Sequence, residues 1–145
     1  MEHKEFNEIV DLIRKEDSRY DRQAYFFLRG ALDQTVKGMR KEGLLQGRQS
    51  NHVSGPELLK GIRSYALDQF GPMALIVLHA WNIGCCADFG EIVFNLIEYG
   101  ILSKTDEDSR EDFSEIYDFD EAFAKPFQPV RRRLPDPPVL TVDQS

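Results

Sequence analysis

Cysteine and histidine side chains are the groups in this chain best suited to nucleophilic, acid–base or metal-binding chemistry. Cys85 and Cys86 are adjacent, whereas zinc sites usually space their cysteine ligands by about two to four residues. His52 and His79 lack a spaced partner of the His-Glu-x-x-His kind. A redox pair or metal site at the cysteines and an acid–base role for His52 stay open, but we expect all four residues to be structural. We predict no catalytic residue, no metal and no cofactor.

A second candidate is the short charged and aromatic segment that contains Asp17, Arg19 and Tyr20. It lies between two predicted helices, and such loops often carry recognition residues. We therefore predict that these three residues bind a partner. The alternative, which we favour, is an Asp–Arg ion pair that pins two helices together.

The strongest charge pattern is an acidic run from residue 106 to residue 121, with nine Asp or Glu side chains and one basic residue, Arg110. The run contains no glycine for the sharp turn of a calcium-binding loop, so an EF-hand is not expected. It is either a solvated acidic face or a docking surface for a partner with a basic surface. The residues predicted to bind that partner are Asp106, Asp108, Glu111 and Asp112.

A basic tail provides the competing hypothesis. Residues 131–133 are three consecutive arginines, and five of the seven prolines lie between residues 126 and 138. This composition is typical of an extended or disordered tail. The arginines could fold back on the acidic run, or could bind nucleic acid. In the nucleic-acid alternative, the binding residues are Arg29, Lys37, Arg40, Lys41 and Arg131 to Arg133.

Composition limits these alternatives. The 145 residues are 41% hydrophobic and 30% charged, with a formal net charge of −7, which suits one globular domain. An acidic chain is a poor general ligand for nucleic acid or for an anionic membrane surface. The N-terminus has no signal-peptide pattern and the two cysteines suit a reducing compartment, so we expect a cytoplasmic protein. The apolar stretch from residue 72 to residue 83 is too short to span a bilayer.

The elements that would position these residues are five helices. Apolar periodicity predicts helices over residues 2–15, 21–42, 54–69, 72–83 and 88–99. Ser54 with Glu57, and Asp88 with Glu91, have the spacing of capping boxes, and Asp21 is a plausible N-cap. The fourth helix is apolar on nearly every side, which is typical of a buried helix.

After the fifth helix the pattern is less regular. Residues 101–105 and 113–119 could pair as strands around an acidic turn, so that helix, strand, turn and strand follow in the order of a winged helix. The competing interpretation is a helical turn at residues 112–115. The capping pattern of Asp118 and Glu121 predicts a short helix that ends near Lys125.

The fold class we predict is mainly α. A single globular domain covers residues 1–125. It consists of a helical pair at 1–42 and a winged-helix-like part with a small β-hairpin at 54–119. Residues 126–145 form the proline-rich tail.

Six segments together carry a resemblance to a known family: 17–20, 24–26, 52–55, 69–71, 88–95 and 108–113. With these segments in this order, the chain resembles a small family of uncharacterised bacterial proteins, known mainly from planctomycetes and verrucomicrobia. The resemblance covers about residues 5 to 125. It implies a bacterial cytoplasmic setting, and it brings no activity, cofactor or catalytic residue.

The function we predict is that of a non-enzymatic interaction module that docks a protein partner through the acidic hairpin. A nucleic-acid-binding regulator is the alternative, and a small enzyme that uses His52 is the third possibility. The sequence does not determine the oligomeric state.

Overall fold

A computed structural model describes residues 5–48, 52–103, 110–114 and 116–127. These residues form helices and connecting turns, and no strand is found among them. The elements are α1 (Phe6–Glu16), α2 (Arg22–Lys41), α3 (Gly55–Phe70), η1 (Gly71–Met73), α4 (Ala74–Ala80), α5 (Cys86–Glu98), η2 (Arg110–Phe113), η3 (Asp120–Ala124) and η4 (Lys125–Phe127). The predicted mainly helical fold is therefore confirmed.

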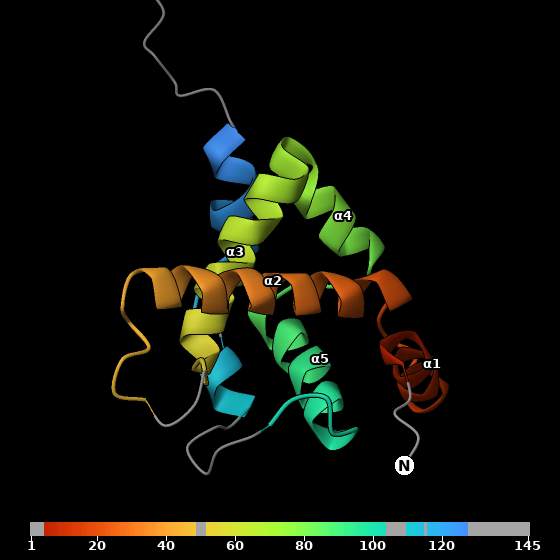
Figure 1. Ribbon diagram of the computed structural model, residues 1–145. Coiled ribbons are helices and arrows are strands. Elements are labelled where there is room, and N and C mark those ends of the chain that lie inside the picture. Colours follow the sequence, from red (N-terminus) through yellow and green to blue (C-terminus); the bar gives the residue numbers. More distant parts are fainter. Residues whose placement is uncertain (1–4, 49–51, 104–109, 115, 128–145) are drawn as a thin grey trace, which may run out of the picture.

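The longest helix, α2, runs across α3 and α5 (Figure 1). Close approach of α2 and α3 requires small residues at the crossing. A Cβ atom at Gly61 would lie only 1.8 Å from Oγ1 of Thr35. The core between these helices contains fully buried side chains from three helices, including Tyr25, Leu59 and Phe89.

Two predicted helix starts are confirmed by their hydrogen bonds. The side chain of Asp21 accepts a hydrogen bond from the backbone N–H of Gln23 at 2.8 Å. Ser54 accepts from the N–H of Glu57, and the Glu57 carboxylate accepts from the N–H of Ser54 at 3.0 Å. Each interaction satisfies backbone donors that the first turn of a helix leaves free.

The start of α5 differs from the prediction. The helix begins at Cys86 with Cys85 as the N-cap, so Asp88 occupies the third helical position. From there its carboxylate accepts hydrogen bonds from the N–H groups of Gly84 at 2.8 Å and Cys85 at 3.2 Å. The same side chain therefore caps the helix from inside its first turn, and Glu91 is left to bind elsewhere.

The predicted burial of the fourth helix is wrong for the side that carries Met73 and Ile76. Ala74 and Leu78 are fully buried, but Met73 is 52% exposed and Ile76 is 60% exposed. The helix α4 has seven residues and packs against α3 and η3. Side chains that face these two elements are buried, and those on the opposite side are exposed. His79, expected in the core, is exposed.

The predicted β-hairpin and winged helix are not found in the described residues. Residues 110–113 form a helical turn instead, and residues 104–109 lie outside the described part. Phe113 is buried and packs closely against α5. A Cβ atom added at Gly90 of that helix would lie only 2.6 Å from the Cβ atom of Phe113. Phe119 and Phe123 also enter the core. The backbone N–H of Ser114 donates to the carbonyl oxygen of Glu111 at 3.0 Å, a local bond of a helical turn rather than a bond to a neighbouring strand.

The short helix predicted before Lys125 is present as η3. The Asp118 side chain accepts a hydrogen bond from the N–H of Glu121 at 3.2 Å, as its capping pattern predicted. The described chain ends at Phe127, and the predicted tail lies almost entirely beyond it.

Candidate functional site

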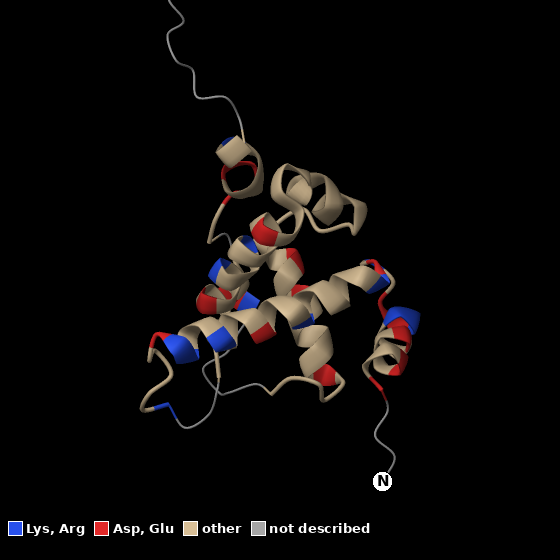
Figure 2. Ribbon diagram, turned by 45° about the horizontal axis from the view of Figure 1, so that its top comes forward, with Lys and Arg blue, Asp and Glu red and all other residues tan. Residues whose placement is uncertain are grey.

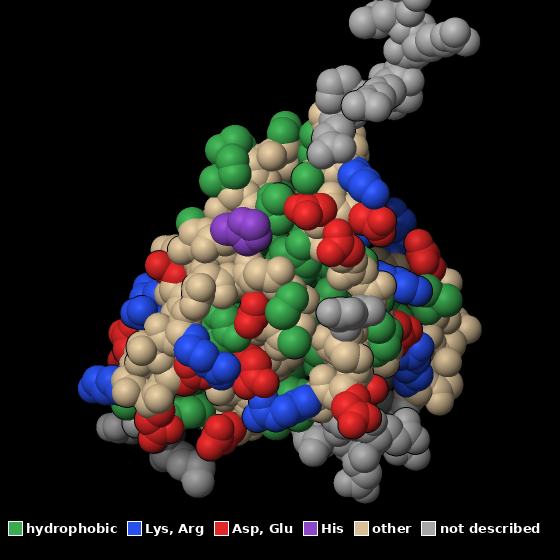
Figure 3. Space-filling model, turned by 180° about the vertical axis from the view of Figure 1, so that it is seen from behind, with side chains coloured by type: hydrophobic (Ala, Val, Ile, Leu, Met, Phe, Trp, Pro, Cys, Tyr) green, Lys and Arg blue, Asp and Glu red, His purple; other side chains and the backbone are tan. Residues whose placement is uncertain are grey.

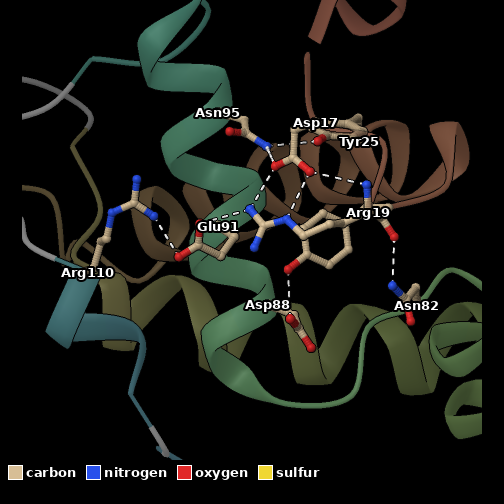
Figure 4. Close-up of polar contacts among 9 residues, drawn as sticks. Asp17, Arg19, Tyr25, Asn82, Asp88, Glu91, Asn95 and Arg110 are labelled. Carbon is tan, nitrogen blue, oxygen red and sulfur yellow. Dashed lines mark hydrogen bonds and ion pairs between the residues drawn. The ribbon is translucent and has the colours of Figure 1, made fainter. Parts of the chain in front are cut away.

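The predicted residues Asp17 and Arg19 form the centre of a polar network between the α1–α2 loop and α5 (Figure 4). The Arg19 guanidinium donates to both oxygens of Asp17, at 2.9 and 2.7 Å. It also donates to Glu91 at 3.1 Å, and Arg110 binds the other oxygen of Glu91 at 2.6 Å. Acidic and basic side chains therefore alternate along this row of ion pairs, which runs from the end of α1 to η2.

Neutral groups complete this network. The Asn95 amide donates to Asp17 at 2.9 Å and to the hydroxyl of Tyr25 at 3.1 Å. The Asn82 amide donates to the backbone oxygen of Arg19 at 2.8 Å. Tyr20 is buried, and its hydroxyl donates to Asp88 at 2.7 Å.

The electrostatics of the network keep Asp17 and Glu91 charged and Tyr20 protonated. The hydrogen bonds from Arg19 hold the pKa of Asp17 well below its usual range, against the opposing effect of burial. The hydrogen bond from Arg110 lowers the pKa of Glu91. Burial, and then the hydrogen bond to Asp88, raise the pKa of Tyr20. These three pKa shifts all run away from neutral pH, whereas a general acid or base needs a pKa near it.

The network therefore matches the alternative expectation for Asp17 and Arg19, an ion pair that joins helices. Their role in binding a partner stays a prediction. Tyr20 is only 2% exposed, so it presents little surface to a partner. The sequence did not indicate Glu91, Asn95 or Arg110 as members, because they are distant in sequence. An isolated carboxylate or amide on a helix gives no signal of such a contact.

The other predicted partner-binding residues are separated. Asp106 and Asp108 lie outside the described residues. Glu111 is exposed on η2, and Asp112 is half-buried beside Gly55, where an added Cβ atom would lie 2.7 Å from that of Asp112. In the described part of the acidic run, three exposed acidic side chains lie at η3 or just before it, namely Asp118, Asp120 and Glu121.

The described cysteines and histidines differ in their surroundings. Cys85 is exposed, while Cys86 is buried and its thiol donates to the backbone oxygen of Tyr117 at 3.3 Å. His52 precedes α3 and His79 ends α4. Over the part of the chain that the structure describes, no three His, Cys, Asp or Glu side chains are grouped to hold a metal ion. None of the described helices combines the length and apolarity needed to cross a membrane.

Two cavities lie between the described helices. One of about 680 Å³ lies where α2 crosses α3 and has a mixed lining that includes Met39, Glu42, Lys60 and Asp68. The second, of about 260 Å³, is mostly apolar and is lined by residues of α2, α3, α5 and η2 and by His52. Ligand pockets usually combine an apolar lining with a few convergent polar groups, and the second lining is closer to this description than the first.

An uncharged surface on η1 and α4 is the feature that the sequence analysis missed. We call it the α4 surface; its exposed residues are Pro72, Met73, Ile76, His79 and Ala80. No Asp, Glu, Lys or Arg occurs from residue 70 to residue 87, and the α4 ribbon carries no charge along its length (Figure 2). That absence of charge was the available signal, and it was interpreted as burial.

The α4 surface borders acidic side chains, because η3 packs against α4. Seen from behind, hydrophobic side chains gather over α4 and acidic side chains lie next to them (Figure 3). We call Asp118, Asp120 and Glu121 the acidic border. Glu121 pairs with Lys125 at 3.2 Å, whereas Asp120 has no ion-pair partner among the described residues.

Comparison of the chain with models of protein families, with curated proteins and with solved structures found no match. The resemblance to a planctomycete and verrucomicrobial family stays a prediction.

Proposed function

We propose that this chain is a non-enzymatic interaction module that docks a protein partner, and that the α4 surface is its docking site. The observation that supports the proposal is the exposure of Met73 and Ile76 in an uncharged stretch of a highly charged chain. Contiguous apolar surface of this kind usually marks an interaction site.

Burial of these side chains would contribute part of the free energy of binding. Covering a large aliphatic side chain completely contributes about 1.5–3 kcal/mol. Since Ile76 is 60% exposed and Met73 52% exposed, covering what remains of each contributes about 1 kcal/mol. A partner that places an apolar side chain here gains from both.

The acidic border determines which partner fits. Asp118, Asp120 and Glu121 would meet a partner beside its apolar anchor, so a partner with basic residues next to that anchor is favoured over an acidic one. This agrees with the predicted basic partner, although the acidic residues involved lie later in the acidic run. Binding should weaken as salt rises, because the border is exposed.

The test is a comparison of Ile76→Lys with Leu44→Lys in the full chain. Leu44 is 52% exposed and lies after α2, so the control introduces the same charge at a similarly exposed position. A protein captured from native lysate is identified, purified and titrated against both variants by calorimetry. We expect Ile76→Lys to weaken binding by at least about tenfold, equivalent to about 1.4 kcal/mol, and Leu44→Lys to have little effect.

The proposal fails if both variants bind the purified partner equally well, or if only nucleic acid is recovered. Recovery of nucleic acid would support the alternative that uses the exposed basic residues of α2, which are Arg29, Lys37, Arg40 and Lys41.

A further inference from the structure

The α4 surface combines two chemistries that one short segment could satisfy. Met73 and Ile76 need an apolar contact, and Asp120 and Glu121, on the adjoining η3, favour a basic one. A complementary segment would therefore have arginine or lysine directly beside an aliphatic residue.

The sequence contains such a segment after the last described residue. Residues 130–134 read Val-Arg-Arg-Arg-Leu, and they include the only three consecutive basic residues in the chain. We propose that this segment, Val130–Leu134, binds the α4 surface of its own chain. The inference rests on the proposed function, since an external partner would have to displace the segment.

The segment starts from the right place. The described chain ends at Phe127 in η4, which follows η3 directly. Seven further residues reach Leu134, and they span at most about 23 Å when extended. Packed helices lie about 8–10 Å apart, so a chain leaving η4 can pass η3 and reach α4.

The order of charged and apolar residues in the segment matches the order of η3 and α4 along its path. The arginines would lie over Asp120 and Glu121 on η3, which the chain passes first, and Leu134 would then lie over Ile76. Lys125 adds positive charge nearby, but it already pairs with Glu121. The Asp120 carboxylate is the principal charge available for an arginine.

Oxidation of Met73 in the full chain measures whether this surface is covered. Hydrogen peroxide converts exposed methionine to the sulfoxide, and peptide mass spectrometry gives the rate at each site. Met39 is only 9% exposed and is the internal reference. The protein is compared with its R131S/R132S/R133S variant at the same concentration.

We expect the arginine substitutions to raise the Met73 rate about fivefold relative to Met39, a change that corresponds to about 1 kcal/mol. This is the sum expected for a few exposed ion pairs. D120R/E121R should raise the rate similarly. Combining it with R131E/R132E/R133E should restore protection, because the charges are then exchanged rather than lost.

Equal Met73 rates in all variants would overturn the inference. So would protection that grows with protein concentration and survives loss of the arginines, because a second copy would then cover the surface. The two proposals can fail separately. Arginine-dependent protection of Met73 with a partner insensitive to Ile76→Lys rejects only the proposed function. A partner sensitive to Ile76→Lys with unprotected Met73 rejects only the tail contact.

Discussion

Asp88 joins two parts of the structure, because its carboxylate accepts hydrogen bonds both from the start of α5 and from Tyr20, so its removal should cost more than a helix cap alone. The carboxylate accepts from the backbone N–H groups of Gly84 and Cys85 at the start of α5. It also accepts from the hydroxyl of Tyr20 at 2.7 Å. We predict that Asp88→Ala destabilises the fold through both contacts.

The magnitude follows from these bonds. Loss of an N-terminal cap costs about 1 kcal/mol. Tyr20 is only 2% exposed, and a buried donor left without its acceptor costs about a further 1–3 kcal/mol. The sum is about 2–4 kcal/mol, which for a chain of this size lowers the melting temperature by roughly 5–15 °C.

A double-mutant cycle separates the two contributions. Urea unfolding gives the free energy of unfolding for Asp88→Ala, Tyr20→Phe and the double variant. In the Tyr20→Phe background no buried hydroxyl is stranded, so Asp88→Ala should cost only the cap, about 1 kcal/mol.

Two results would refute this reasoning. An unchanged melt of Asp88→Ala would show that the cap contributes nothing. An equal cost of Asp88→Ala in both backgrounds would show that the Tyr20 contact is not coupled to Asp88.

Three further predictions concern acid, packing and DNA. Hydrogen bonds from Arg48 lower the pKa of Glu57 to about 2, so this pair stabilises the fold above about pH 4.5 and is lost as the pH falls through about 2. Arg48→Ala should reduce that acid dependence in urea unfolding between these pH values, whereas an unchanged profile would count against it. Gly61→Ala should destabilise by about 1–3 kcal/mol through its clash with Thr35; Thr35→Ala should relieve part of that loss, and the absence of relief would reject the clash. In a gel shift at physiological salt the protein should not retain duplex DNA, since α5 contains no Lys or Arg and affinity depends on such contacts; retention that falls with salt would contradict this.

The sequence alone predicted those features whose cause lies within a few residues. The caps at Asp21 and Ser54 are present because donor and acceptor are separated by two or three positions. Asp88 is a capping residue as predicted, but it caps from the third helical position, so the predicted start of α5 was three residues too late. An acidic residue can cap a helix either from the N-cap position or from the third helical position. The conformation of the preceding turn at Gly84 and Cys85 decides between the two for Asp88.

Only the tertiary structure decided the contacts between distant segments. Arg19 and Glu91 are 72 residues apart, and nothing in their local sequence pairs them. An acidic run and an uncharged helix are both visible in the sequence, but their adjacency depends on how η3 packs against α4.

The same distinction explains the error at α4. Its composition established that the helix has no charged face, and an apolar helix gains free energy when it is covered. Whether it is covered depends on how many neighbours surround it, which composition does not record. Ile76 remains exposed because it lies away from α3 and η3, the elements that cover the buried side of this short helix.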